Sequence, residues 1–336
     1  MYPLLKNPVY GGRVTLRTAY GILCGRAMRH TSVVQLTGAK PALGSIEPAS
    51  LLTYETMVPA RLLRRYKRFL GDVELRVDAQ DEDAAPSTTQ AVIHVPNTGP
   101  MTGLLDELPS RVALSLSANL KRKYAHSLEW IHLQKEAVWV GVHSARANAM
   151  AKELLSTHCL TGLPDYDNIT PEVRFGRNGA SRVDFLLQHS KSNTQCHVEV
   201  KSVTLAATSE AGDRLALFPD TVSTRAQRHV SELMAVARAG GQAALLFLVQ
   251  RSDCVAFAPC HECDPVYAEG VVAAAAAGVR LLAAAVAFDP GAGCVRYCGQ
   301  LPVLLQYQLR DGQTLRAPAA LSRQKLAGAG KRPRKA

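Results

Sequence analysis

The residues with the clearest chemical use lie in the stretch CHVEVKSVTL, at 196–205. Its alternating valines predict a buried strand, and Glu199 and Lys201, two residues apart, share the opposite face of that strand. Upstream, SRVDFLLQ (181–188) shows the same alternation and carries Asp184 on its polar side. A short polar segment joins the two stretches, which predicts a hairpin that brings Asp184 beside Glu199 and Lys201.

Two carboxylates and an ammonium group in one small patch suit chemistry on a phosphate. Hard divalent ions such as Mg²⁺ take oxygen ligands, often one or two carboxylates together with phosphate and water. Such an ion polarises a phosphoryl oxygen, and a nearby lysine offsets the charge that develops on the phosphate. A solvated strand face explains the same Glu-x-Lys spacing, and an exposed pair of this kind contributes little to stability. The spacing alone leaves both interpretations open.

Charge and hydropathy argue against a membrane protein. The net charge is +11 in 336 residues, but residues 51–315 carry 26 basic and 27 acidic residues, so the excess lies in the two ends. The longest apolar run, 270–288, is interrupted by a glycine and an arginine, which predicts a helix followed by a strand rather than a membrane span. The eight cysteines predict free thiols in a reducing compartment. Zinc is not expected, because CHEC (260–263) and CVRYC (294–298) stand too far apart for a compact motif.

Composition divides the chain into four parts. Residues 1–51 are rich in Arg and nearly free of acidic residues, which is typical of a mitochondrial transit peptide; a disordered extension without an address explains them as well. Short alternating stretches predict a small β-barrel over 52–135. Helices alternate with apolar strands over 136–310, which indicates an α/β core. Residues 311–336 form a basic, disordered tail. The expected location is mitochondrial, with the nucleus or the cytoplasm as alternatives.

The pattern also predicts individual elements within these parts. Helical spacing marks 145–156, 221–241 and 266–277, and a continuous apolar run at 243–250 predicts a buried strand. The acidic stretch 78–90 is low in apolar residues and is expected to be a flexible loop.

Two basic clusters interleave aromatic residues with Arg and Lys. They are RLLRRYKRF (61–69), at the start of the strand pattern LLRRYKRFLGDVELRV (62–77), and NLKRKYAH (119–126). Cations contact phosphates and aromatic rings stack on bases, so these clusters predict a nucleic-acid surface. A solvated strand face remains the alternative.

Seven blocks of this sequence resemble, in order and spacing, the sugar fermentation stimulation protein (SfsA) family. The Asp184, Glu199 and Lys201 pattern is also similar to the PD-(D/E)xK motif of restriction-endonuclease-like nucleases, although Val183 replaces the usual proline. The resemblance implies an α/β (α+β) protein with an N-terminal OB-type β-barrel and a restriction-endonuclease-like domain with a mixed sheet. The blocks are RYKRFLGDV (65–73), VPNTGPMTG (95–103), SANLKRKYAHSLEW (117–130), RANAMAKE (146–153), SRVDFLL (181–187), CHVEVKSVTL and FPDTVSTRAQRHVSELM (218–234).

The resemblance also implies roles for single residues. Asp184 and Glu199 would hold Mg²⁺ or Mn²⁺, and Lys201 would be the catalytic lysine. Four further residues would form the pocket rim, and a salt-bridged, exposed helix face is the alternative for the three of them that lie on the predicted helix. The nucleic-acid track would come from the barrel, where Asn97 and Thr98 also fit a plain turn. The rim residues are Asp220, Arg225, His229 and Glu232, and the track residues are Arg65, Lys67, Arg68, Asn97, Thr98, Lys121, Arg122, Lys123 and Tyr124.

Some features depart from the compact bacterial pattern of the family. The leader, the acidic loop and the basic tail are additional, and the leader indicates a eukaryotic, organellar homologue. His143 and Leu104 replace the Asn and Cys that the pattern favours. The leading hypothesis is a DNA-binding protein (with RNA as a possible substitute) that has a Mg²⁺-dependent nuclease-like site. The alternatives are a non-catalytic DNA-binding or regulatory protein, as in the sugar metabolism of bacterial relatives, and an enzyme that acts on a nucleotide or another phosphate ester.

Overall fold

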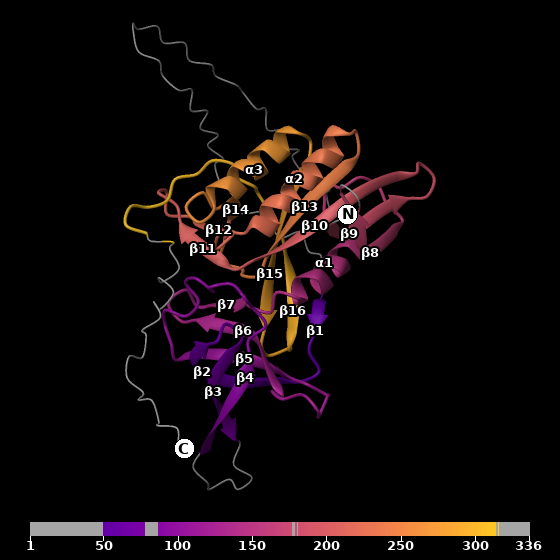
Figure 1. Cartoon of the computed structure of the whole chain (residues 1–336). Helices are drawn as coiled ribbons and strands as arrows, with labels where there is room; N and C mark the ends of the chain where they lie inside the picture. Colours follow the sequence, from indigo (N-terminus) through magenta and orange to yellow (C-terminus); the bar gives the residue numbers. More distant parts are fainter. Residues whose placement is uncertain (1–49, 78–86, 177–178, 180, 314, 316–336) are drawn as a thin grey trace, which may run out of the picture. The chain divides into compact units, whose positions relative to one another are not determined.

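A computed structural model describes residues 50–77, 87–176, 179, 181–313 and 315 (Figure 1). The predicted leader, most of the acidic loop and nearly all of the basic tail therefore lie outside the described residues.

The strands within residues 57–141 form a six-stranded sheet that closes on itself. The strand order is β4-β3-β2-β5-β6-β7, and a bridge between His94 and Ser127 joins β4 to β6. Alternate residues of these strands, such as Leu62, Val112 and Ile131, are fully buried in one apolar core. This arrangement confirms the predicted barrel. Its strands are β2 (Met57–Tyr66), β3 (Leu70–Val77), β4 (Ser87–His94), β5 (Ser110–Leu116), β6 (His126–Leu133) and β7 (Val138–Gly141).

The basic stretch 62–77 is not one strand but a hairpin. Lys67 and Arg68 have φ angles of 48° and 67° and turn the chain between β2 and β3. Positive φ at two successive residues matches the right-handed twist of a tight hairpin, although Gly and Asn are the usual residues there. The cluster at 61–69 is therefore spread over a strand end and an exposed turn.

The rest of the described chain is built on a mixed seven-stranded sheet. Its order is β1-β16-β15-β13-β10-β9-β8, with β13 parallel to both β10 and β15 and the other pairs antiparallel. A small sheet of β11, β12 and β14 lies beside it in the fold (Figure 1). These strands are β1 (Ser50–Thr53), β8 (Asn168–Phe175), β9 (Ser181–His189), β10 (Thr194–Val203), β11 (Leu205–Thr208), β12 (Arg214–Phe218), β13 (Gln242–Val249), β14 (Ala256–Pro259), β15 (Arg280–Asp289) and β16 (Cys294–Leu301).

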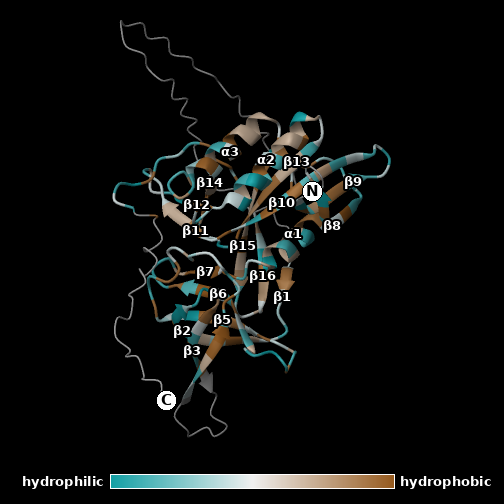
Figure 2. Ribbon diagram, in the orientation of Figure 1, coloured by the Kyte–Doolittle hydropathy of each residue, from teal (hydrophilic) through white to brown (hydrophobic). Residues whose placement is uncertain are grey.

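Helices cover both faces of this sheet, and apolar residues concentrate on its central strands (Figure 2). Helix α1 (Arg146–Ser156) packs on the face that carries Val198 and Val200. Helices α2 (Thr224–Arg238) and α3 (Pro265–Ala276) pack on the other. Because side chains alternate along β10, Glu199 and Lys201 point to the side of α2 and α3.

The fold is therefore mixed α/β with an OB-type barrel, as the sequence predicts. Two strands lie across the expected domain limits: β7 extends the barrel sheet beyond residue 135, and β1 pairs with β16 in the seven-stranded sheet. Among the helices that the structure describes, none is both long and apolar enough to cross a membrane.

Candidate functional site

The site forms where strands β9 and β10 separate. Their backbone pairing ends at Phe185 and Val198. One residue farther, the side chain of Asp184 takes over: its Oδ2 accepts the backbone N–H of Val200 at 2.7 Å, and its Oδ1 accepts from Nδ2 of Asn148 on α1 at 2.8 Å. The carboxylate thus replaces a strand partner and is fixed at the fork.

Glu199 lies next to this fork and is only 3 % exposed. Its Oε1 accepts from Nζ of Lys201 at 2.5 Å and from Nδ1 of His229 on α2. Its Oε2 is buried and has no hydrogen-bond partner among the described residues. The solvated-face interpretation of this pair is therefore wrong, because the charged face of β10 packs under α2.

The two carboxylates have pKa values shifted in opposite directions. Burial, and then the charge of Glu199, raise the pKa of Asp184. Burial also acts to raise the pKa of Glu199, but the hydrogen bond from His229 and the charge of Lys201 outweigh it and lower that pKa. Glu199 is thus held ionised, and Asp184 carries the electrostatic cost of a second buried negative charge.

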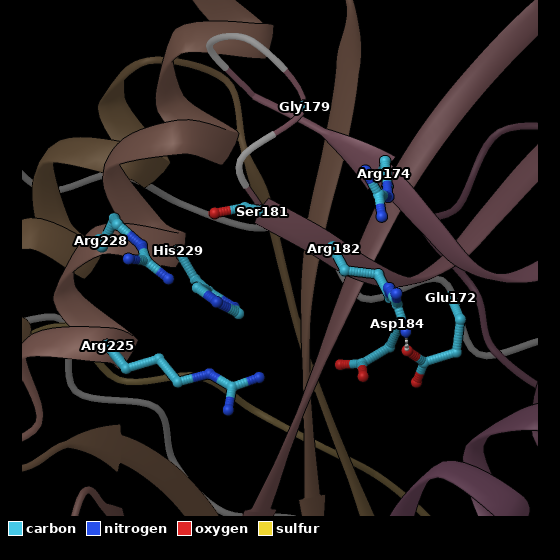
Figure 3. Close-up of a pocket in the computed structure, with 9 residues that line it drawn as sticks. All are labelled: Glu172, Arg174, Gly179, Ser181, Arg182, Asp184, Arg225, Arg228 and His229. Atoms are coloured by element: carbon cyan, nitrogen blue, oxygen red, sulfur yellow. Dashed lines mark hydrogen bonds and ion pairs between the residues drawn. The ribbon is translucent and has the colours of Figure 1, made fainter.

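An arginine-lined cavity of about 620 Å³ opens beside Asp184. Arg225 and His229 extend from α2 toward Asp184, while strands β8 and β9 supply the opposite wall (Figure 3). Glu172 in that wall binds Arg182 at 3.2 Å. Four guanidinium groups against two carboxylates give the cavity a basic lining that suits phosphate oxygens. The arginines are Arg174, Arg182, Arg225 and Arg228.

A second cavity, of about 330 Å³, is lined by Asn148 and Lys201, which contact Asp184 and Glu199 respectively. Asn97, Thr98 and Gly99 of the barrel line it together with Lys201 and Asp220. Burial raises the pKa of Asp220, against the backbone hydrogen bonds and the charge of Arg65.

The predicted pocket rim is therefore divided between different places. Arg225 and His229 line the arginine-lined cavity, Asp220 lines the second cavity, and Glu232 packs against Gly176. His229 is 3 % exposed. The helix stripe is not an exposed salt-bridged face at this residue, because the fork of the sheet offers His229 a buried carboxylate partner.

The predicted nucleic-acid track divides into structural and exposed residues. The guanidinium of Arg65 is half-buried and donates to the carbonyl oxygens of Asn97, Gly99 and Arg68 at 2.7, 2.9 and 2.5 Å. Arg68 also donates to the carbonyl of Thr98 at 3.0 Å. Arg65 thus holds the loop that lines the second cavity. The exposed members are Lys67, Arg68, Thr98, Lys121, Arg122 and Lys123, with Lys123 placed 5.5 Å from the ring centre of Tyr124.

We expect Arg65→Ala to destabilise the protein by about 2 kcal/mol, because several carbonyl oxygens lose a charged donor. Lys67→Ala, two residues away on the exposed turn, is expected to change stability by about 0.5 kcal/mol or less. Urea unfolding followed by fluorescence compares the two variants. Equal stabilities of the two variants would contradict the structural role of Arg65 and would favour its predicted role in nucleic-acid binding.

A second buried cluster escaped the sequence analysis. The side chain of Glu129 on β6 is fully buried and binds Arg146 at 3.0 Å, His143 at 2.9 Å, Ser115 at 2.7 Å and the hydroxyl of Tyr54 at 3.3 Å. The only local signal was an acidic residue inside the apolar run LEWIHL. The cluster joins the barrel to the first turn of α1.

Cavity residues Arg174, Arg182 and Arg228 were also missed. Arg174 and Arg182 are direct register partners on β8 and β9, so they share one face. The register of the β8–β9 hairpin could have predicted that pair. Arg228 could not be predicted in this way, because its place in the cavity depends on where α2 packs.

Comparison with known proteins identifies both parts of the chain. Residues 63–142 match the SfsA N-terminal OB domain, and residues 145–292 match the sugar fermentation stimulation protein RE domain. A sugar fermentation stimulation protein homolog of Acaryochloris marina is 41 % identical over 74 % of this chain and 94 % of its own. One of Geobacter sp. is 43 % identical over 66 % and 87 %.

A solved structure, described as Pyrococcus furiosus SfsA in complex with Ca²⁺, covers 76 % of this chain and 99 % of its own. Its TM-score is 0.62 at 25 % sequence identity.

These relatives correct one expectation. Curated homologues at about 40 % identity come from cyanobacteria and other bacteria, so the predicted mitochondrial location, and the organellar homologue inferred from the leader, are wrong. The two domain matches span most of the described residues, and the bacterial relatives align over nearly their whole length. The chain belongs to the SfsA family.

Proposed function

We propose that this protein binds nucleic acid and hydrolyses its phosphodiester bonds at Asp184 and Glu199, with Mg²⁺ or Mn²⁺ as cofactor. The observation that carries the proposal is a pair of carboxylates, the half-buried Asp184 and the buried Glu199, with Lys201 in contact with Glu199, beside an arginine-lined cavity. Perturbed carboxylates in a cavity with convergent charges are typical of catalytic sites. The OB-type barrel and its exposed basic residues support a nucleic acid as the partner.

The residues at the fork fit a divalent cation. Oε2 of Glu199 is a buried anionic oxygen that no described residue hydrogen-bonds, and the ionised form of Asp184 is destabilised by burial and by the neighbouring negative charge. A cation would relieve both. Within the described ranges, no group of three or more His, Cys, Asp or Glu side chains forms a metal site. Two carboxylates nevertheless suffice for Mg²⁺ when phosphate and water complete its shell. The description of the Pyrococcus relative with Ca²⁺ supports a divalent ion.

Each residue then has a defined task. A bound divalent ion would supply Lewis-acid polarisation of the phosphodiester. Lys201 offsets negative charge that develops on the phosphate. Asn148 and the N–H of Val200 keep Asp184 in place, and His229 fixes Glu199 through Oε1. The cavity arginines hold the flanking phosphates of the strand.

One observation favours a second candidate, a protein that binds nucleic acid without cleaving it. Lys201 and His229 both occupy the same oxygen of Glu199, so the cluster is largely satisfied as an ion-pair network. In that case the charged group would hold α2 on the sheet, and the barrel alone would do the binding.

The experiment incubates the full-length protein with end-labelled single- and double-stranded DNA in Mg²⁺, in Mn²⁺ or in EDTA, beside Glu199→Gln. We expect cleavage only with metal and only in the wild type, and binding by both proteins. Glu210→Gln, at an exposed position, is the matched control and should cleave normally. Binding without cleavage in either metal would leave the non-catalytic candidate.

A further inference from the structure

We propose that the second cavity takes the base and sugar of one unpaired nucleotide, next to the phosphate that lies at the carboxylate pair. The preferred substrate is then single-stranded or locally opened nucleic acid rather than a continuous duplex. This inference rests on the proposed function and specifies its substrate class.

The position of the cavity is the first argument. Lys201 and Asn148 both line it, and each also contacts one carboxylate: Lys201 binds Glu199, and Asn148 binds Asp184. Asp184 itself lines the arginine-lined cavity. The carboxylate pair is therefore in contact with residues of both cavities. A phosphodiester held there has a neighbour on each side, one directed into each cavity.

The contrast in charge between the two cavities is the second argument. Four arginines line the first cavity, which suits a run of phosphates. The second has one cation and one anion, Lys201 and Asp220, and its other walls are neutral. Its apolar side is made by Leu205, Leu217 and the Phe218–Pro219 pair. An apolar wall with a few polar groups suits a nucleobase, which has apolar faces and a hydrogen-bonding edge.

The cavity also has a hydrogen-bonding edge. The carboxylate of Asp220 faces the barrel loop, where a Cβ on Gly99 would fall 3.2 Å from its Oδ2 and 3.1 Å from Oδ1 of Asn97. The glycine therefore keeps this edge open. A carboxylate accepts from the amino group of a base, such as N4 of cytosine. Arg65 donates to the carbonyl oxygens of Asn97 and Gly99 and so holds the loop in this position.

The volume of the second cavity limits its occupant to one nucleotide. The volume of about 330 Å³ is at the lower end of the roughly 300–1,000 Å³ of small-molecule pockets. A paired base would keep its partner strand, so entry requires a base that is unpaired or turned out of its helix.

The test compares three ligands of equal length in EDTA, by fluorescence anisotropy with the full-length protein. They are a single-stranded DNA heptamer of deoxycytidine, the same backbone with every base removed, and the heptamer paired with its complementary strand. The two single strands carry the same phosphates, so their electrostatic binding is equal. We expect the intact strand to bind about fivefold or more tightly than the abasic strand, the least that one stacked base contributes.

Two variants locate the effect. In Gly99→Ala and in Asp220→Asn the ratio of the affinities for the intact and the abasic strand should fall toward one. Gly291→Ala and Asp213→Asn, at exposed turns, should keep it. Thermal unfolding verifies that each variant folds. If a variant does not fold, the comparison of the three ligands with the wild-type protein still tests the inference.

Three outcomes would overturn the inference. Equal binding of intact and abasic strands shows that no base is held, and equal or tighter binding of the duplex shows that pairing is no obstacle. A base preference that survives in both cavity variants places the bases elsewhere. In all three, the proposed function stands. If no oligonucleotide binds at all, the proposed function fails, and this inference fails with it.

Discussion

Asp184→Asn is expected to reduce metal-dependent cleavage by about 100-fold or more, the loss that follows removal of one charged group acting on a transition state. Asn keeps the size of the side chain and an oxygen that accepts the Val200 N–H. One negative charge is lost at the fork, and Asn148 has to turn its amide so that its oxygen faces the new NH2 group. Affinity for nucleic acid should be kept or increased, because the arginine-lined cavity then contains one carboxylate fewer.

The same variant should also be more stable than the wild type. The pKa of Asp184 is raised by burial and by Glu199, so the ionised form costs free energy in the folded state at neutral pH. The neutral amide removes that cost. Lower activity together with higher stability is typical of a functional site rather than a structural ion pair. Single-turnover cleavage and urea unfolding measure the two effects.

Asp213→Asn is the control for both measurements, because Asp213 is exposed. Unchanged cleavage in Asp184→Asn would contradict the role of the carboxylate pair. Loss of stability together with loss of cleavage would show that Asp184 acts chiefly as a strand partner.

Glu129→Gln is expected to destabilise the protein by about 3 kcal/mol, since it removes the charge from a buried pair and leaves Arg146 and His143 with a neutral partner. For a protein of this size the melting temperature should fall by roughly 6–12 °C. The effect should reach the candidate site as well, because Arg146 starts α1 and Asn148 on the same helix holds Asp184. Differential scanning calorimetry measures the loss.

The acid response of this cluster is a further part of the same prediction. Burial acts to raise the pKa of Glu129, but the hydrogen bonds from His143 and Arg146 outweigh it and lower that pKa from 4.5 to about 2. The stabilisation is therefore complete above pH 4.5 and is lost as the pH falls from 4.5 toward 2. Stability of the Glu129→Gln variant should depend less steeply on pH across this window.

Glu210→Gln, at an exposed position, controls for the substitution itself and should behave as the wild type. A Glu129→Gln protein that melts at the wild-type temperature would contradict the stabilising role of the cluster. An unchanged pH slope would show that another carboxylate governs acid unfolding.

The spacing of apolar residues and the polar segments between them predicted most of the strands and helices of this protein from its sequence. Alternation gave the strands of the barrel and the hairpin of β9 and β10, and that hairpin brought Asp184 to Glu199 and Lys201. The helices α1, α2 and α3 followed from helical spacing, and the structure adds the N-caps Ser223 and Asp264 of the last two. These features depend on neighbours close in the chain, which a pattern can report.

Tertiary structure decided which charged residues are buried and which partners they have. His229 meets a carboxylate 30 residues away, and Arg65 meets carbonyl groups more than 30 residues away. Glu129 binds Tyr54 across 75 residues. A period says which face of an element a residue occupies, but not which element packs on that face. The second cavity depends on the same information, because the barrel loop and the Phe218–Asp220 segment meet only when the sheets are packed together.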